Sequence, residues 1–261
     1  MDNCLNCETE LEGNFCVECG QRATSKRFTV KTLWDSEFLE QNFSLTRGLP
    51  KTLLSLLYRP GKLAREYVAG KRKRYFPFVG LFLLLAAADA VIRGYADLSV
   101  LDILAQRYGI HLGGFEQSSV SRGFNNYFRL FALLAVPVVA FFQWLIIRKL
   151  RWNFWEHCVA VFFLLCAQLW TGVLIIAPTL LPLPAGLESG LLTVAGVVSF
   201  LITMLFYQPL LTGNGWGKGL KAFGMAVLFF SFYSSIIGLG VFAFAETDKQ
   251  EGGTSITIGV Q

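Results

Sequence analysis

Five long apolar stretches limit what this chain of 261 residues can fold into. Each is close to the roughly 20 residues that an α-helix needs to cross the hydrocarbon core of a bilayer. The composition agrees, since 54% of the residues are hydrophobic and 16% are charged, against about 25% charged in soluble proteins. The sequence therefore predicts an all-α integral membrane helix bundle with about five transmembrane helices, at 76–92, 128–147, 158–178, 190–210 and 222–245.

Four of the six cysteines form two CxxC pairs near the start of the chain, Cys4 with Cys7 and Cys16 with Cys19. Four thiolates at this spacing are typical of a tetrahedral structural zinc site. A redox pair would need a surrounding βαβ pattern, which this segment lacks. We expect a small zinc ribbon over residues 1–22, with a hairpin turn at Gly13 and Asn14 and with Zn²⁺ needed for folding.

Residues 23–75 are predicted to form a cytoplasmic amphipathic and basic segment. Thr29 is a candidate N-cap for one helix, and Pro50 is suited to begin a second that runs to Tyr58. This second helix is too short to span, so it either lies among the lipid headgroups or packs against the bundle. The cations that follow are expected to contact anionic lipid: Lys62, Arg65, Lys71, Arg72, Lys73 and Arg74.

The distribution of charge predicts the topology. Placing residues 1–75 and the links around 148–151 and 218–221 in the cytoplasm collects 18 of the 23 Lys and Arg residues on that side, as the positive-inside rule requires. The opening residues do not resemble a cleaved signal peptide. We therefore expect a multipass protein of a bacterial inner (plasma) membrane, with bundle residues 76–245, an outer loop at 93–127, a cytoplasmic N-terminus and a polar extracytoplasmic tail at 246–261.

Three polar residues are weak candidates for catalysis. Asp89 stands four residues before Arg93 on one helical face, so an ion pair at the end of the first span is the simpler interpretation. Glu156 and His157 precede the third span, where they could relay protons or contact a lipid phosphate. Adjacent helical residues diverge by about 100°, which favours a role in starting the helix.

The remaining polar features favour structural roles. Three glutamines, Gln143, Gln168 and Gln208, are expected to bridge helices. The glycine series from Gly213 to Gly219 lacks the ending of a phosphate-binding loop and is predicted to be a flexible turn. Cys158 and Cys166 are expected to act as small apolar residues.

Three stretches resemble a family of uncharacterised bacterial multipass membrane proteins, the domain-of-unknown-function family numbered 3667. They are FCVECGQ at the end of the ribbon, KTLLSLLYRPGKLAREYVAGKRKRYFPF, and NFWEHCVAVFF before the third span. Lys51 stands where the family is expected to have arginine. The resemblance implies a cytosolic ribbon joined to a membrane bundle, and it implies no activity.

These observations favour a non-enzymatic function. The leading hypothesis is a zinc ribbon that docks or regulates an unidentified protein partner at the cytosolic membrane surface, with anionic lipid bound to the basic segment. The alternative is a small transporter or lipid-handling enzyme that uses Glu156, His157 and Asp89. Nucleic-acid binding ranks last because the cations adjoin the membrane, and homo-oligomerisation is left open.

Overall fold

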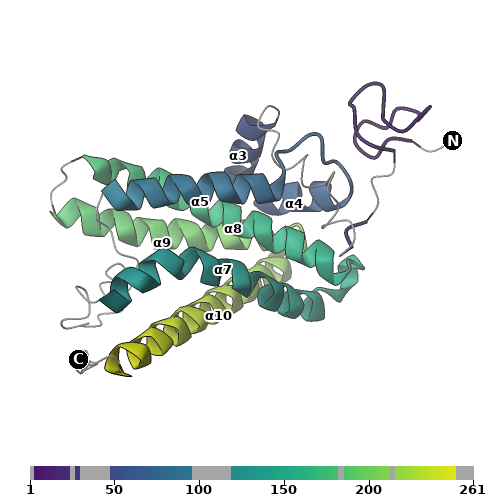
Figure 1. Cartoon of the computed structure of the whole chain (residues 1–261). Helices are drawn as coiled ribbons and strands as arrows, with labels where there is room; N and C mark the ends of the chain where they lie inside the picture. Colours follow the sequence, from purple (N-terminus) through teal and green to yellow (C-terminus); the bar gives the residue numbers. More distant parts are fainter. Residues whose placement is uncertain are drawn as a thin grey trace.

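A computed structural model describes residues 3–23, 27–29, 48–95, 119–181, 185–211 and 215–250. Within these ranges the chain forms seven α-helices, two short 3₁₀-helices and two isolated β-bridges, with no strand, which confirms the all-α prediction (Figure 1). Five long helices coincide with the five apolar stretches: α5 (Phe78–Tyr95), α7 (Ser119–Ile146), α8 (Phe154–Ile176), α9 (Ala185–Tyr207) and α10 (Gly215–Gln250).

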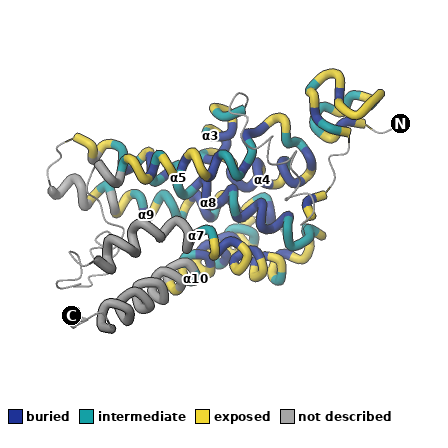
Figure 2. The backbone as a smooth tube through the Cα atoms, in the orientation of Figure 1, coloured by how far each residue is buried: buried dark blue, intermediate teal, exposed yellow. Residues whose placement is uncertain are grey.

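Helix α8 is the centre of the bundle. It packs against α5, α7 and α9 and also against the two short helices that precede α5. Phe163, Leu164 and Cys166 on α8 are fully buried, and buried residues (dark blue in Figure 2) occur along most of its length. Since α8 is apolar around its circumference, it suits this central position. Cys158 is also buried there, in agreement with its expected role as a small apolar residue.

Two short helices lie beside the bundle, α3 (Leu49–Tyr58) and α4 (Pro60–Val68). Each carries a proline in its first turn, where the missing N–H would have no partner anyway. Helix α3 packs against α4 and α8 with Leu56 fully buried, so packing against the bundle is the better of the two predicted arrangements. No helix was predicted between Tyr58 and the first span, so α4 is an element that the sequence pattern did not reveal.

Gly61 allows α4 to approach the end of α9 closely. A Cβ atom at this position would lie 1.9 Å from the carbonyl oxygen of Phe206 and 2.7 Å from Cγ of Pro209. Any larger residue would force these backbones apart. The first turn of α4 is thereby fixed against the segment that follows α9.

One helix among the described residues, α8, is long and apolar enough to cross a membrane by itself. Its most apolar window has a mean hydropathy of 2.4, and 61% of that window is buried by other parts of the protein. Shorter apolar stretches lie at Phe78–Ile92, Leu133–Ile146 and Thr193–Tyr207. This supports membrane association, and the number of spans stays a prediction.

Two local predictions can be compared with the helices. The glycine-rich segment is not a flexible turn from Gly215 onward, because α10 begins there; glycine weakens a helix by about 1 kcal/mol and does not forbid it. Gln168 does bridge helices, since its amide donates to the Thr203 hydroxyl at 2.6 Å and to the Ser199 carbonyl at 3.1 Å. The predicted helix after Thr29, most of the loop at 93–127 and the tail from 251 lie outside the described residues.

Candidate functional site

The four N-terminal cysteines converge on one point. Their sulfur atoms all lie within 4.8 Å of one another, with 3.6 Å between Cys4 and Cys19 and 3.4 Å between Cys7 and Cys16. All four are free thiols. A tetrahedral Zn–S distance of about 2.3 Å places neighbouring sulfurs about 3.8 Å apart, so the cluster fits a metal ion bound by four thiolates.

The two CxxC segments are copies of one loop, displaced by twelve residues. In the first copy the amide of Cys4 donates to Thr9 O and the amide of Glu8 donates to Cys4 O, both at 2.8 Å. The second copy repeats both bonds at 2.8 Å, from Cys16 to Gln21 O and from Gly20 to Cys16 O. Both loops need a left-handed residue after the second cysteine, with φ of 67° at Glu8 and 68° at Gly20, where glycine is better suited.

Each loop closes on itself, which overturns the predicted hairpin between them. The isolated bridges join Asn3 with Glu10 and Phe15 with Arg22. Phe15 does not form a core, since it is 52% exposed with the Arg22 guanidinium 5.3 Å from its ring centre. Among the residues described in this segment, Cys4, Cys16 and Gln21 are the buried ones. A metal ion held by the four cysteines would therefore take the place of a hydrophobic core.

The ribbon docks on a loop between α4 and α5, which we call the basic loop (residues 70–74). Gln21 is 2% exposed, and its amide nitrogen donates to Gly70 O at 2.8 Å while its amide oxygen accepts the Lys73 N–H at 3.4 Å. Leu5 lies against Gly70, where an added Cβ would come within 2.8 Å of the leucine side chain. Gly70 also has φ of 105°, so both its conformation and its contact require glycine.

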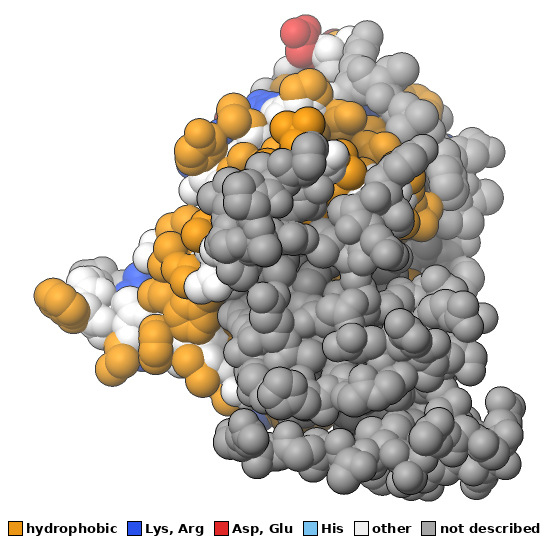
Figure 3. Space-filling model, turned by 90° about the vertical axis from the view of Figure 1, so that its left-hand side faces the viewer, with side chains coloured by type: hydrophobic (Ala, Val, Ile, Leu, Met, Phe, Trp, Pro, Cys, Tyr) orange, Lys and Arg blue, Asp and Glu red, His pale blue; other side chains and the backbone are white. Residues whose placement is uncertain are grey.

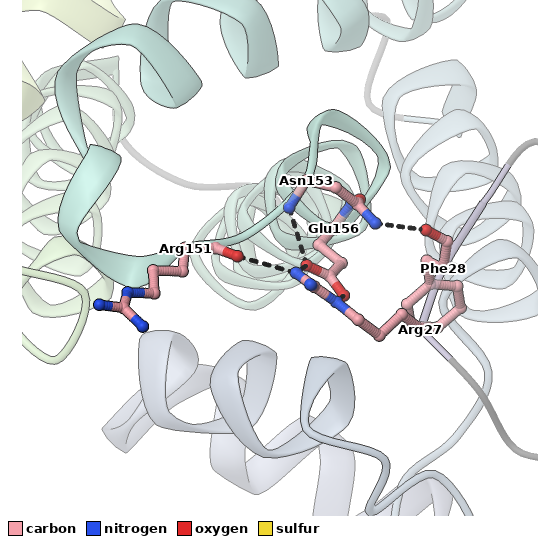
Figure 4. Close-up of polar contacts among 5 residues, drawn as sticks. All are labelled: Arg27, Phe28, Arg151, Asn153 and Glu156. Carbon is pink, nitrogen blue, oxygen red and sulfur yellow. Dashed lines mark hydrogen bonds and ion pairs between the residues drawn. The ribbon is translucent and has the colours of Figure 1, made fainter.

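A second connection ties the chain after the ribbon to the start of α8. Arg27 donates from Nε to Glu156 Oε1 at 2.8 Å and from Nη2 to Glu156 Oε2 at 2.6 Å, and Nη2 also donates to Arg151 O (Figure 4). The Glu156 carboxylate in turn raises the pKa of Arg27 through this bond and its charge. Glu156 and Asn153 also form a reciprocal capping box that begins α8. Glu156 therefore has a structural role, because it holds Arg27 and begins α8.

Phe28 fills the space behind this ion pair. It is fully buried, stacks on Tyr67 of α4 with ring centres 6.0 Å apart, and lies 3.9 Å below the Arg72 guanidinium. Its carbonyl accepts a hydrogen bond from the Asn153 amide at 2.7 Å. We call residues 27–29 the strap, because these contacts join α4, the basic loop and α8.

A pocket of about 350 Å³ lies where these parts meet. Leu5 of the ribbon, Arg27 of the strap and Gly70 of the basic loop contribute to its wall, together with the link before α8. Its polar groups are largely satisfied, since the carboxylate of Glu156 is already paired with Arg27. The pocket thus exists because the docked ribbon supplies part of its wall.

The three weak catalytic candidates do not meet in this pocket. Glu156 lines it, whereas His157 and Asp89 do not. His157 is fully buried beside the Trp152 ring, and its nitrogens have no hydrogen-bond partner among the described residues. Asp89 is buried on α5, and the side chain of its expected partner Arg93 lies outside the described part of the structure.

The six predicted lipid-contacting cations occupy different surroundings. Lys62 and Arg74 lie 4.0 Å and 3.7 Å from Glu66, and Lys71 lies 4.0 Å from Glu8 of the ribbon. Arg65 donates to Pro209 O at 3.3 Å. Arg72 is directed onto Phe28, while Lys73 is exposed. Most of these cations are exposed to solvent, but the ribbon contacts the basic loop that carries four of them.

Tyr75 closes the basic loop against α4. Its hydroxyl donates to the Glu66 carboxylate. Burial and this bond raise the pKa of Tyr75 to about 12. Burial alone would raise the pKa of Glu66, but the bond from Tyr75 and the charges of Lys62 and Arg74 outweigh it, so the pKa of Glu66 lies below its ordinary value.

Sequence reasoning found the cysteines and missed the strap. Arg27 and Phe28 carry no motif, and their partners lie more than a hundred residues away in the case of Glu156 and Asn153. The one available signal was the spacing of Asn153 and Glu156, which is that of a capping box before an apolar run. It locates the start of α8 and says nothing of Arg27.

Comparisons with known proteins give one match. No curated protein and no solved structure matches the chain significantly. Residues 47–88 match the family described as "Protein of unknown function (DUF3667)", which confirms the predicted resemblance for this segment. The segment comprises α3, α4, the basic loop and the first part of α5.

Proposed function

We propose that this protein is a membrane-anchored metal-ribbon protein in which the ribbon acts as a docking or regulatory module for a protein partner at the cytosolic surface of a bacterial inner membrane. The observation that carries the proposal is the meeting of four thiols within 4.8 Å on a ribbon that is itself attached to the base of an apolar helical bundle. The attachment holds the ribbon at one end of the bundle.

Zn²⁺ is the metal that best suits this site. Four thiolates in a closed tetrahedral arrangement leave no open position for a substrate or water, as in structural zinc sites. Cys4, Cys7, Cys16 and Cys19 would hold the ion, which would supply a crosslink between the two loops. The ribbon has little apolar core of its own, which is consistent with folding that depends on metal.

A multipass arrangement is supported by the surface of the bundle. Leu134 and Ile146 on α7 and Leu201 on α9 are between 50% and 68% exposed, which is costly in water and favourable in hydrocarbon. Seen from the end of the bundle opposite the ribbon, the described side chains are mainly hydrophobic (Figure 3). The ribbon and the end of α10 lie at opposite ends of the bundle, in keeping with a cytoplasmic N-terminus and an extracytoplasmic C-terminus (Figure 1).

The exposed side of the ribbon is the part available to a protein partner. Val17 is 76% exposed and Phe15 is 52% exposed, so an apolar surface remains after the ribbon has docked on the basic loop. The cations Lys62, Lys73 and Arg74 are exposed and would contact anionic headgroups in the proposed arrangement. The alternative of a transporter or lipid enzyme receives less support, because Glu156 is paired and does not share a pocket with His157 or Asp89.

Three measurements on the full-length chain test the proposal. Metal analysis of the purified protein should give one zinc per chain, and reporters fused to each end should place the N-terminus in the cytosol and the C-terminus outside. Crosslinking in cells should capture partners that are lost in a Val17→Glu variant with normal metal content. A chain without zinc, an exported ribbon, or partners unchanged by Val17→Glu would each contradict the proposal.

A further inference from the structure

The ribbon and the basic loop carry opposite charge. Residues 3–23 contain four glutamates and one arginine, a formal charge of −3 before the cysteines are counted. Four thiolates around a divalent ion would add a further −2. The loop on which the ribbon docks contains Lys71, Arg72, Lys73 and Arg74 in succession. An acidic module therefore lies against a loop of four consecutive cations.

The contacts that join the two parts come from the metal-binding loops themselves. Leu5 lies between Cys4 and Cys7, Glu8 follows Cys7, and Gln21 comes two residues after Cys19. Gln21 uses both ends of its amide on the basic loop, and Glu8 lies 4.0 Å from the Lys71 ammonium. Because the backbone of these loops depends on the four thiolates meeting at one ion, the docking surface exists only while the metal is bound.

The basic loop is also where anionic lipid would bind. Helix α5 begins at Phe78, four residues after Arg74, so the loop lies at the level of the headgroups if α5 enters the membrane. Each cation near an anionic surface contributes about 1 kcal/mol to membrane attraction. Lys73 is already exposed, whereas Lys71 is only 33% exposed beside Glu8. The ribbon and anionic headgroups would therefore compete for Lys71.

We infer that the metal-loaded ribbon is a reversible cap on the basic loop, which excludes anionic phospholipid from Lys71 and releases this side chain when the metal is lost. This inference rests on the proposed metal ribbon at the membrane surface and adds a regulatory role to it. The direction is fixed by charge: undocking removes a negative module and leaves the cations without their intramolecular counter-charge.

The test uses the full-length chain in nanodiscs that contain phosphatidylglycerol and phosphatidylcholine. A Gln21→Ala variant keeps every cysteine but loses both bonds to the loop. We expect it to bind metal normally and to show hydrogen exchange at the amides of residues 71–73 about tenfold faster than the parent. A Leu5→Ala variant is the second probe of docking, and Val17→Ala, which changes the equivalent residue of the other metal loop, is the matched control with unchanged exchange.

The lipid arm measures how many phosphatidylglycerol molecules native mass spectrometry finds retained on each chain. Gln21→Ala and the metal-chelated parent should both retain more phosphatidylglycerol than the metal-loaded parent, with retention of phosphatidylcholine unchanged. Adding Lys71→Gln should remove the gain. Metal-loaded Gln21→Ala and Leu5→Ala chains with the parent's exchange or the parent's phosphatidylglycerol retention would overturn the cap. Those outcomes leave zinc content and topology intact, whereas a chain lacking zinc would overturn the proposed function.

Discussion

The ribbon and the helical bundle are stabilised by different means. In the bundle, fully buried apolar side chains such as Phe163, Leu164 and Phe206 pack between helices, and the close van der Waals contacts of these side chains stabilise it. In the ribbon, Leu5, Phe15 and Val17 are each about half exposed or more, so apolar burial contributes little. The ribbon can therefore lose its fold while the bundle keeps its own.

The largest expected effect is the selective loss of the ribbon. Replacing a ligand with Cys16→Ser, or chelating the metal, should unfold residues 3–23 because metal binding supplies roughly 10–16 kcal/mol in comparable sites. Hydrogen exchange should become fast in the ribbon while far-ultraviolet circular dichroism of the helices is retained. Cys166→Ser, which changes a cysteine of the bundle, is the control and should keep the bound metal. If the ribbon amides stayed protected from exchange without metal, the ribbon would not depend on metal for its fold.

The reverse experiment damages the bundle and spares the ribbon. Gly61→Ala introduces a Cβ 1.9 Å from Phe206 O, and overpacking of this kind lowers the free energy of unfolding by about 3 kcal/mol. Gly172→Ala on α8 meets no atom within 4 Å and should instead stabilise the helix by up to about 1 kcal/mol. Thermal unfolding in detergent measures both. Equal stability of the two variants would show that the close approach of α4 and α9 is unimportant.

An intermediate effect is expected at the strap, which connects the two regions. Glu156→Gln removes the charge paired with Arg27 and should lower the free energy of unfolding by about 1–3 kcal/mol. Arg151→Gly keeps the carbonyl that accepts from Arg27 and relieves a left-handed residue with φ of 53°, so it should stabilise by up to about 1 kcal/mol. Both are measured by thermal unfolding. A Glu156→Gln variant as stable as the parent would show that the strap does not stabilise the protein.

The smallest expected effect concerns Tyr75 and Glu66 under the basic loop. The pKa of Tyr75 is raised to about 12, so its contribution is present below its unfolded pKa of about 10 and is lost as the pH rises toward 12. The pKa of Glu66 is lowered, so its contribution is present at neutral pH and is lost as the pH falls through that lowered value. Tyr75→Phe should lower stability by about 1 kcal/mol and reduce the alkaline loss of stability. An unchanged alkaline profile in thermal unfolding would contradict this assignment.

Patterns short enough to be read locally were predicted correctly. The five apolar stretches coincide with α5, α7, α8, α9 and α10, because a long run of apolar residues has few alternatives to a buried or membrane-embedded helix. The four cysteines meet as their CxxC spacing indicates. Helix α4 was not predicted, because Pro60 and Gly61 are common where a helix ends, although proline is also well suited to the first turn of a helix.

By itself the sequence determined the all-α class, the positions of the long helices and the four thiols that could hold a metal, since each depends on residue type and spacing along a short segment. The tertiary structure decided where the ribbon docks, that Glu156 pairs with Arg27, and that Phe28 fills the space beneath Arg72. These contacts join residues far apart in the chain, and their partners are ordinary glutamine, arginine and phenylalanine side chains. Only the packing of α4 against α8 and α9 brings the groups within reach, and no local pattern carries that information.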